Sequence, residues 1–150
     1  MINYFIEAWD KYKSNLKEYF ETHRQEDFAN DYESILKVVV DNVINKREEV
    51  DFNNKDIRVV DFGDYQGTQI FSFHVDCYQP TVADTFYTSI YYGSCSGCDT
   101  LLRIRYNGDN SEEIPNKEQV NDYMKLALNL IQNIKCYGNV EESKITWGLE

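Results

Sequence analysis

Four side chains in the middle of the chain have the types and spacing of a tetrahedral zinc site. Cys95 and Cys98 form a C-x-x-C pair, and seventeen residues separate it from the H-x-x-C pair His74 and Cys77. Two thiolates at C-x-x-C spacing can bind one zinc ion, and a structural site needs four ligands. However, residues three apart on a regular strand point to opposite faces. His74 and Cys77 could therefore both ligate only if the predicted strand ends or bulges near Asp76.

The Cys95/Cys98 pair also has the arrangement of a redox-active motif. It follows a predicted strand and precedes a segment in which Asp99 could cap a short helix. A helix N-terminus lowers the pKa of a nearby thiol and favours thiol–disulfide exchange. A thioredoxin-like fold needs a parallel βαβ unit, whereas the strands before Cys95 are predicted to be antiparallel. A third interpretation is a tight turn in which the cysteines pack as small apolar side chains.

Acidic side chains gather near the ends of the predicted strands. They are Asp61, Asp64, Asp76, Asp84 and Asp99. Paired carboxylates in such a place could bind Mg²⁺ or act as the acid and base of a hydrolase. Aspartate is also a common turn residue, because its side chain hydrogen-bonds the local backbone. A carboxylate-dependent hydrolase is therefore an alternative function, although we identify no catalytic residue from the sequence itself.

The charge of the chain restricts its partners. The 150 residues carry a formal net charge of −11, and the isoelectric point is about 4.6. Repulsion from phosphate makes direct binding to nucleic acid or to an anionic membrane unfavourable. A basic protein is a more suitable partner, including a protein that normally holds nucleic acid. We therefore expect a protein partner and no direct nucleic-acid or membrane partner.

Tyrosines near the predicted strand ends would supply apolar anchors for such a partner. The chain has twelve tyrosines, and aromatic residues make up 15% of it. Tyrosine is enriched at the energetically important positions of protein interfaces. The predicted binding site combines three tyrosines with two carboxylates, namely Asp64, Tyr65, Tyr91, Tyr92 and Asp99. The carboxylates would occupy the places of phosphates in the partner's basic groove.

Amphipathic helices are predicted on both sides of this region. Residues 3–24 carry apolar side chains every three or four positions, which places these side chains on one face. A second helix is predicted from Asn30, whose side chain would form a capping box with Glu33. A third and longer helix begins after Asn116, which starts a similar capping box, and continues to about Tyr137.

Three segments between these helices are predicted to be strands. Residues 56–62, 69–76 and 85–92 are rich in β-branched and aromatic residues. In the second of them Phe71, Phe73 and Val75 share one face, so this face should be buried. Residues 63–67 are typical of a hairpin turn. Short loops between consecutive strands favour an antiparallel arrangement.

Two shorter elements complete the predicted fold. Residues 98–106 are interpreted as a short helix that begins near Asp99, and residues 144–147 as an edge strand. We predict one α+β domain over residues 1–150. In it, a small antiparallel sheet of three or four strands packs against two N-terminal helices and one long C-terminal helix.

The sequence has neither the pattern of a membrane span nor that of a secretion signal. It contains no run of about 18 apolar residues. The first residues, MINYFIEAWDKYK, lack the basic, apolar and small-residue regions of a signal peptide. We therefore expect a cytoplasmic protein whose cysteines are reduced or bound to metal.

Three strings in the middle of the chain resemble a known group of proteins. GDYQGT (63–68), YQP (78–80) and YYGSCSGCDTL (91–101) are similar to strings in small proteins encoded by phages and prophages of Gram-positive bacteria. CSGCDTL is the most specific of these matches, and His74 and Cys77 are not part of the shared pattern. The resemblance brings no established activity or site. It implies a viral accessory protein that acts inside a bacterial cell.

We therefore expect an acidic accessory protein that binds a host protein and inhibits or modulates it by charge mimicry. A nucleic-acid-binding defence factor of the host is one such partner. This function requires no cofactor. The alternative is a zinc-binding or thiol-redox protein that works through Cys95 and Cys98, and the second alternative is the carboxylate-dependent hydrolase.

Overall fold

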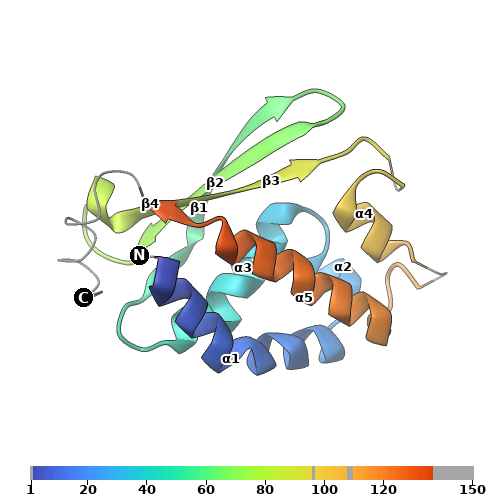
Figure 1. Cartoon of the computed structure of the whole chain (residues 1–150), viewed down its shortest axis with the longest axis horizontal. Helices are drawn as coiled ribbons and strands as arrows, with labels where there is room; N and C mark the ends of the chain where they lie inside the picture. Colours follow the sequence, from blue (N-terminus) through green and yellow to red (C-terminus); the bar gives the residue numbers. More distant parts are fainter. Residues whose placement is uncertain (1, 96, 108–109, 137–150) are drawn as a thin grey trace.

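The chain forms one antiparallel sheet with helices packed against one of its faces (Figure 1). The computed structural model describes residues 2–95, 97–107 and 110–136. Its elements, in chain order, are α1 (Ile2–Thr22), α2 (Gln25–Phe28), α3 (Tyr32–Asn42), the 3-10 helix η1 (Ile44–Lys46), β1 (Phe52–Gly63), β2 (Gly67–Val75), the 3-10 helix η2 (Val82–Asp84), β3 (Thr85–Tyr92), α4 (Thr100–Arg105), α5 (Lys117–Gln132) and β4 (Lys135–Cys136). The predicted α+β fold is confirmed.

The strands lie in the order β1-β2-β3-β4, and each pair of neighbours is antiparallel. The hairpin between β1 and β2 is confirmed, with Gly63 opposite Gly67. Within the described residues, β4 pairs with β3 through Lys135 and Cys136. One edge of the sheet is therefore β1, and the other edge is shared by β4 and the rest of β3.

The two faces of the sheet differ because successive side chains alternate along each strand. The face toward the helices, called the inner face below, carries Phe73 of β2 and Phe86 of β3, and both are fully buried. These rings meet Phe5 of α1 and Phe52 of β1, with ring centroids 5.3 to 6.2 Å apart. Burying one phenylalanine contributes about 1.5–3 kcal/mol, so this cluster is a main attachment between the sheet and α1.

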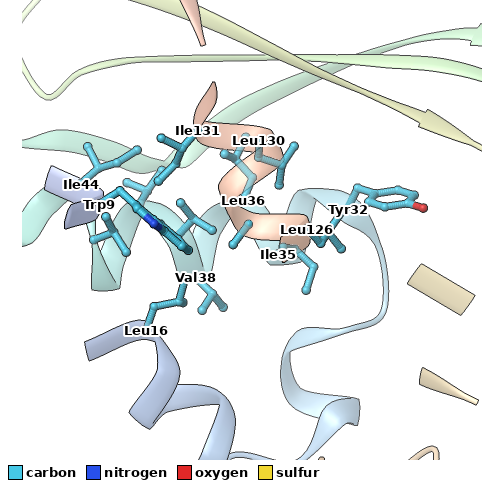
Figure 2. Close-up of a cluster of buried hydrophobic side chains, with 14 of the residues drawn as sticks. Trp9, Leu16, Tyr32, Ile35, Leu36, Val38, Ile44, Leu126, Leu130 and Ile131 are labelled. Carbon is cyan, nitrogen blue, oxygen red and sulfur yellow. The ribbon is translucent and has the colours of Figure 1, made fainter. Parts of the chain in front are cut away.

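The helices share a second part of the core, shown in Figure 2. Most of its side chains come from α1, α3 and α5, where apolar residues recur every three or four positions, as predicted, and Ile44 of η1 joins them. The labelled members include Trp9, Leu16, Ile35, Leu36, Leu126, Leu130 and Ile131. In the described part of the chain, no helix is both long enough and apolar enough to cross a membrane.

The start of the second predicted helix differs from the sequence prediction. The predicted cap was Asn30, but α3 begins one residue later, and Asp31 accepts a hydrogen bond from the Ser34 N–H at 2.7 Å. The reason is the additional short helix α2, which the sequence did not predict. Asn30 closes that helix, because its side chain donates to the Glu26 carbonyl at 2.7 Å.

The long helix α5 begins as predicted and ends earlier. Asn116 accepts from the Gln119 N–H at 2.8 Å, and Gln119 accepts from the Asn116 N–H at 2.9 Å, which confirms the capping box. The helix ends at Gln132 and not near residue 137, because Lys135 and Cys136 pair with β3. The edge strand predicted over residues 144–147 lies outside the described residues.

The first strand is longer than predicted and contains an irregularity. β1 begins at Phe52 and not at the predicted residue 56, since Phe52 pairs with Val75 and joins the aromatic cluster. The register then shifts between Asn53 and Arg58. The Asn53 side chain accepts hydrogen bonds from the N–H groups of residues 55 and 56, at 2.7 and 2.9 Å. This side chain therefore holds a bulge in place of regular pairing.

Candidate functional site

The far end of the β1–β2 hairpin projects away from the helices (Figure 1). All six residues of β1 from Arg58 to Gly63 are exposed. The same strand is buried at Phe52, where the helices cover it. The far half of β1 is therefore accessible to another molecule from both faces of the sheet.

An apolar patch lies on the outer face of the sheet, opposite the helices. Val60 lies beside Ile70 of β2, and two residues further along β1 Phe62 lies beside Thr68 of β2, which separates it from Tyr91 of β3. Val60, Phe62 and Tyr91 are 52%, 61% and 59% exposed. We call Val60, Phe62, Ile70 and Tyr91 the outer patch. Exposed apolar side chains gathered in this way are typical of protein interaction sites.

A shallow groove of about 270 Å³ continues the outer patch toward β4. It is lined by Ile70, Tyr87, Thr88, Ser89, Asn133 and Lys135. Thr88 donates to the Leu130 carbonyl at 2.6 Å, and Asn133 donates to the Ser89 carbonyl at 3.3 Å. The side chains of Thr88 and Asn133 are therefore already hydrogen-bonded within the protein. A bound molecule would meet the Tyr87 ring and the Ile70 side chain beside the Lys135 ammonium group.

Two glycines shape the hairpin turn next to the patch. A Cβ atom on Gly63 would lie 2.2 Å from the Gln66 carbonyl oxygen, and one on Gly67 would lie 2.2 Å from the Phe62 carbonyl oxygen. Both distances are too short for any side chain. The two strands can approach this closely because glycine has no Cβ. The turn then presents Asp64 and Tyr65 to solvent, with Tyr65 83% exposed.

The inner face of the hairpin end is polar. The Tyr92 hydroxyl donates to Asp61 Oδ1 at 2.5 Å, and the Gln69 amide donates to Asp61 Oδ2 at 3.2 Å. Tyr92 shares its row with Gly67 and Gly63, so no side chain of β1 or β2 occupies the space beside its ring. The hydrogen bond to the Asp61 carboxylate raises the pKa of Tyr92 to about 12.

The structure brings together three of the five residues predicted to bind a partner. Asp64, Tyr65 and Tyr91 are all exposed at the end of the hairpin and of β3. Tyr92 lies on the inner face, opposite Tyr91, because adjacent residues of a strand point to opposite sides. The fifth, Asp99, lies elsewhere.

Asp99 is buried, with 4% of its surface exposed. Its Oδ1 atom accepts from the Tyr32 hydroxyl at 2.8 Å and from the Gly93 N–H at 3.0 Å, and its Oδ2 atom accepts from the Leu102 N–H at 3.0 Å. The carboxylate caps α4 and joins this helix to α3. It is therefore not part of the exposed surface, and its role in this structure is to hold the loop after β3.

The four candidate zinc ligands are in two separate places. His74 pairs with Thr85 at the beginning of β3, whereas Cys95 and Cys98 follow the end of that strand. The seven residue steps along β3 span about 23 Å, so the arrangement does not bring the four side chains to one ion. His74 Nε2 lies 3.0 Å from Asp56 Oδ2, and this hydrogen bond lowers the pKa of Asp56. Among the described residues, no group of three or more His, Cys, Asp or Glu side chains could hold a metal ion.

The two cysteines of the C-x-x-C motif lie in a tight exposed turn. The Cys95 carbonyl accepts from the N–H groups of Cys98 and Asp99, at 3.1 and 2.8 Å. The Cys95 N–H lies 2.9 Å from the Cys98 sulfur. Hydrogen bonds from Cys95, first from its side chain and then from its backbone, lower the pKa of the Cys98 thiol. Cys98 is therefore an exposed thiol with increased thiolate character.

The aspartates considered for hydrolysis do not form one cluster. Asp84 closes a capping box with Thr81 at η2, and Asp99 caps α4. Asp61 lies on the inner face of the hairpin end, where Tyr92 and Gln69 hydrogen-bond it. These three carboxylates therefore have separate local partners in three different parts of the fold.

Sequence reasoning missed the apolar half of the candidate surface. Phe62 was interpreted only as part of a strand end, although Val59 and Val60 before it show that this strand has apolar residues on both faces. Such a pattern fits either a strand covered on two sides or one that is open to a partner. The structure shows that the far half of β1 is exposed on both sides.

Comparison of the chain with protein-family models, with curated proteins and with solved structures gave no match.

Proposed function

We propose that this chain is a protein-binding factor that docks on a basic protein through its outer patch and the adjacent hairpin turn, and thereby inhibits or modulates that protein. The observation that carries the proposal is the exposure of Val60, Phe62 and Tyr91, which are 52–61% exposed on the same face of the sheet. Aromatic side chains of this kind are typical anchors of protein interfaces.

The charge of the chain supports a basic partner. The net charge is −11, and Asp64 adds an exposed carboxylate beside Tyr65 at the hairpin turn. Carboxylates at this end of the sheet would take the places of phosphates in the groove of a nucleic-acid-binding protein. The resemblance to phage and prophage proteins would place this partner in the cytoplasm of a bacterial cell, where a viral accessory protein meets host defence factors.

A binding titration tests this function. A partner is first captured from a lysate of a Gram-positive bacterium and purified. Its affinity is then measured for the natural chain, for the double variant Phe62→Ser/Tyr91→Ser and for the control Glu18→Lys on the exposed side of α1. We expect the double variant to weaken binding by about a hundredfold, since two interface anchors contribute about 1–2 kcal/mol each. Equal affinity of all three proteins would refute the proposal.

Salt and nucleic acid test the charge mimicry separately. Screening over about 8–10 Å near physiological ionic strength weakens attraction between surface charges. The association rate with a basic partner should therefore fall as salt rises, and nucleic acid should compete for the partner. If neither affects binding while Phe62→Ser/Tyr91→Ser does, the chain binds a protein without mimicking nucleic acid.

Thiol chemistry at Cys98 is a second candidate function, because this thiol is exposed and its pKa is lowered. The rate of alkylation by iodoacetamide, measured against pH, should show one thiol that reacts at lower pH than the others and is absent from Cys98→Ser. The zinc content of the same purified sample tests metal binding by Cys95 and Cys98. If all four thiols share one ordinary pH profile and the protein carries no zinc, the cysteine turn has a structural role only.

A further inference from the structure

The free edge of β1 is a second feature of the hairpin end. Residues 58–63 of β1 pair with β2 on one side, and among the described residues no strand pairs with their other side. In an antiparallel sheet, every second residue of an edge strand directs its N–H and C=O groups outward. Six residues provide about 20 Å of such edge. This length is sufficient for a short extended segment of another chain.

After Arg58, the edge contains neither lysine nor proline, no bulge interrupts it, and Asp61 is its one charged side chain. Natural edges are protected by lysine, by proline or by bulges. The bulge of β1 lies before Arg58, and the residues after it are Val59, Val60, Asp61, Phe62 and Gly63. The Arg58 guanidinium lies 3.5 Å from the Asp56 carboxylate, and Arg58 is the one basic residue among residues 58–63. An approaching strand would therefore meet an apolar edge with one acidic side chain.

We propose that β1 binds an extended segment of the partner as an additional strand, and that this segment alternates apolar and basic residues. The inference rests on the proposed function and specifies the partner's binding segment. Side chains of the added strand on the outer face would lie beside Val60 and Phe62, which favours apolar residues. Side chains on the inner face would lie beside Val59 and Asp61, which favours basic residues.

Asp61 can accept a bond from a basic residue in addition to its present ones. Its two partners, the Tyr92 hydroxyl and the Gln69 amide, are neutral groups. An ionised carboxylate has about four acceptor positions, so two remain for a lysine or arginine. The nearby Asp64 at the turn adds a second negative charge. A second copy of this chain is a less suitable occupant, because each copy carries a net charge of −11.

Synthetic peptides provide a direct test. The probe is the blocked heptapeptide Lys-Val-Lys-Val-Lys-Val-Lys, and its control is the isomer Lys-Lys-Val-Val-Val-Lys-Lys, which has the same charge and composition. A third peptide is the alternating one with N-methyl groups on the central valine and the lysine after it, which blocks hydrogen bonding on both of its edges. Binding is measured by calorimetry, and protection of β1 amides from hydrogen exchange is measured with each peptide.

We expect the alternating peptide to bind at least about tenfold more tightly than either control. The isomer cannot place all its valines on one face and its lysines on the other, and the methylated peptide loses a backbone hydrogen bond and carries a methyl group into the pairing edge. The alternating peptide should also protect amides of residues 58–63. The variant Asp61→Asn keeps an acceptor for the Tyr92 hydroxyl and removes the charge, so it should weaken the alternating peptide while the chain stays folded, which its circular-dichroism spectrum checks. Equal binding of the three peptides, or protection elsewhere in the chain, would overturn the proposal.

Two further outcomes separate this inference from the function on which it rests. If Phe62→Ser/Tyr91→Ser abolishes partner binding but the alternating peptide does not compete with the partner, the outer patch binds the partner and the edge does not. If sedimentation shows that the free chain is a dimer that Val60→Lys dissociates, the edge belongs to a second copy of the chain. Either result would overturn the strand-addition proposal.

Discussion

The two ends of the sheet are built from the same three strands and have opposite surroundings. At the end near Phe52, the inner face is covered by α1, and the rings of Phe73 and Phe86 are fully buried. At the hairpin end, Val60 and Phe62 are more than half exposed. The covered end holds the sheet to the helices, and the open end contributes little to that attachment. Apolar residues at the open end are therefore available for a partner.

The largest expected effect lies in the covered part of the molecule. Ile131 of α5 is fully buried in the cluster of Figure 2. Ile131→Asp places a carboxylate there without a partner, which should lower the free energy of unfolding by about 4 kcal/mol or more. Denaturant unfolding measures the change. Unchanged stability would mean that this side of α5 does not face the core.

Substitution of one phenylalanine at each end of the sheet compares how much the two ends contribute to stability. Phe73→Ala removes a fully buried ring and should cost about 3–5 kcal/mol of unfolding free energy. Phe62→Ala changes a side chain that is 61% exposed and should alter stability by less than about 0.5 kcal/mol. The two variants are compared under the same denaturant conditions. A similar loss in both would show that the hairpin end is covered in solution, for example by self-association.

Substitution of two aspartates compares the stability contribution of a buried carboxylate with that of an exposed one. Asp99→Ala removes the cap of α4 and leaves the buried Tyr32 hydroxyl without its acceptor, so it should cost about 2 kcal/mol. Asp64→Ala should change stability by less than about 0.5 kcal/mol, since Asp64 is exposed at the turn. Thermal unfolding measures both. If Asp99→Ala weakens partner binding and leaves stability unchanged, Asp99 belongs to the binding surface after all.

The smallest expected effect is a titration at the hairpin end. The hydrogen bond to the Asp61 carboxylate raises the pKa of Tyr92 from 10.0 to about 12, because loss of the hydroxyl proton would break this bond. Since the pKa in the folded state exceeds that in the unfolded state, the hydrogen bond stabilises the fold below about pH 10, and this contribution is lost as pH rises through about 12. NMR of ring-labelled tyrosine follows the titration. Asp61→Asn should return the pKa of Tyr92 toward 10.0, and an unchanged value would exclude Asp61 as the cause.

Features with local causes could be predicted from the sequence. The capping box of Asn116 and Gln119 and the cap of α4 at Asp99 depend on residues within three positions of each other. The alternation in residues 69–76 correctly placed Phe71 and Phe73 on the buried face. Such features follow from backbone hydrogen bonding and strand geometry, which neighbouring residues determine.

Features with distant causes could not be predicted. Alternation shows which residues share a face but not whether a helix covers that face, so the exposure of Phe62 was not foreseen. The end of α5 depends on pairing between Lys135 and Tyr87, which are far apart in the chain. Asp99 was predicted both to cap a helix and to bind a partner. Its contact with Tyr32, 67 residues earlier, shows that the carboxylate is used inside the protein.

The bulge held by Asn53 reverses the sidedness of β1. Phe52 faces the helices, and on a regular strand every second residue after it would face them too, including Val60 and Phe62. Instead, the four residues 54–57 lie opposite the single residue Phe73, so the alternation changes phase before Arg58. Val60 and Phe62 consequently face away from the helices. A single asparagine near the start of β1 thus determines which face of the sheet each later side chain of the strand occupies, and thereby which residues a partner can reach.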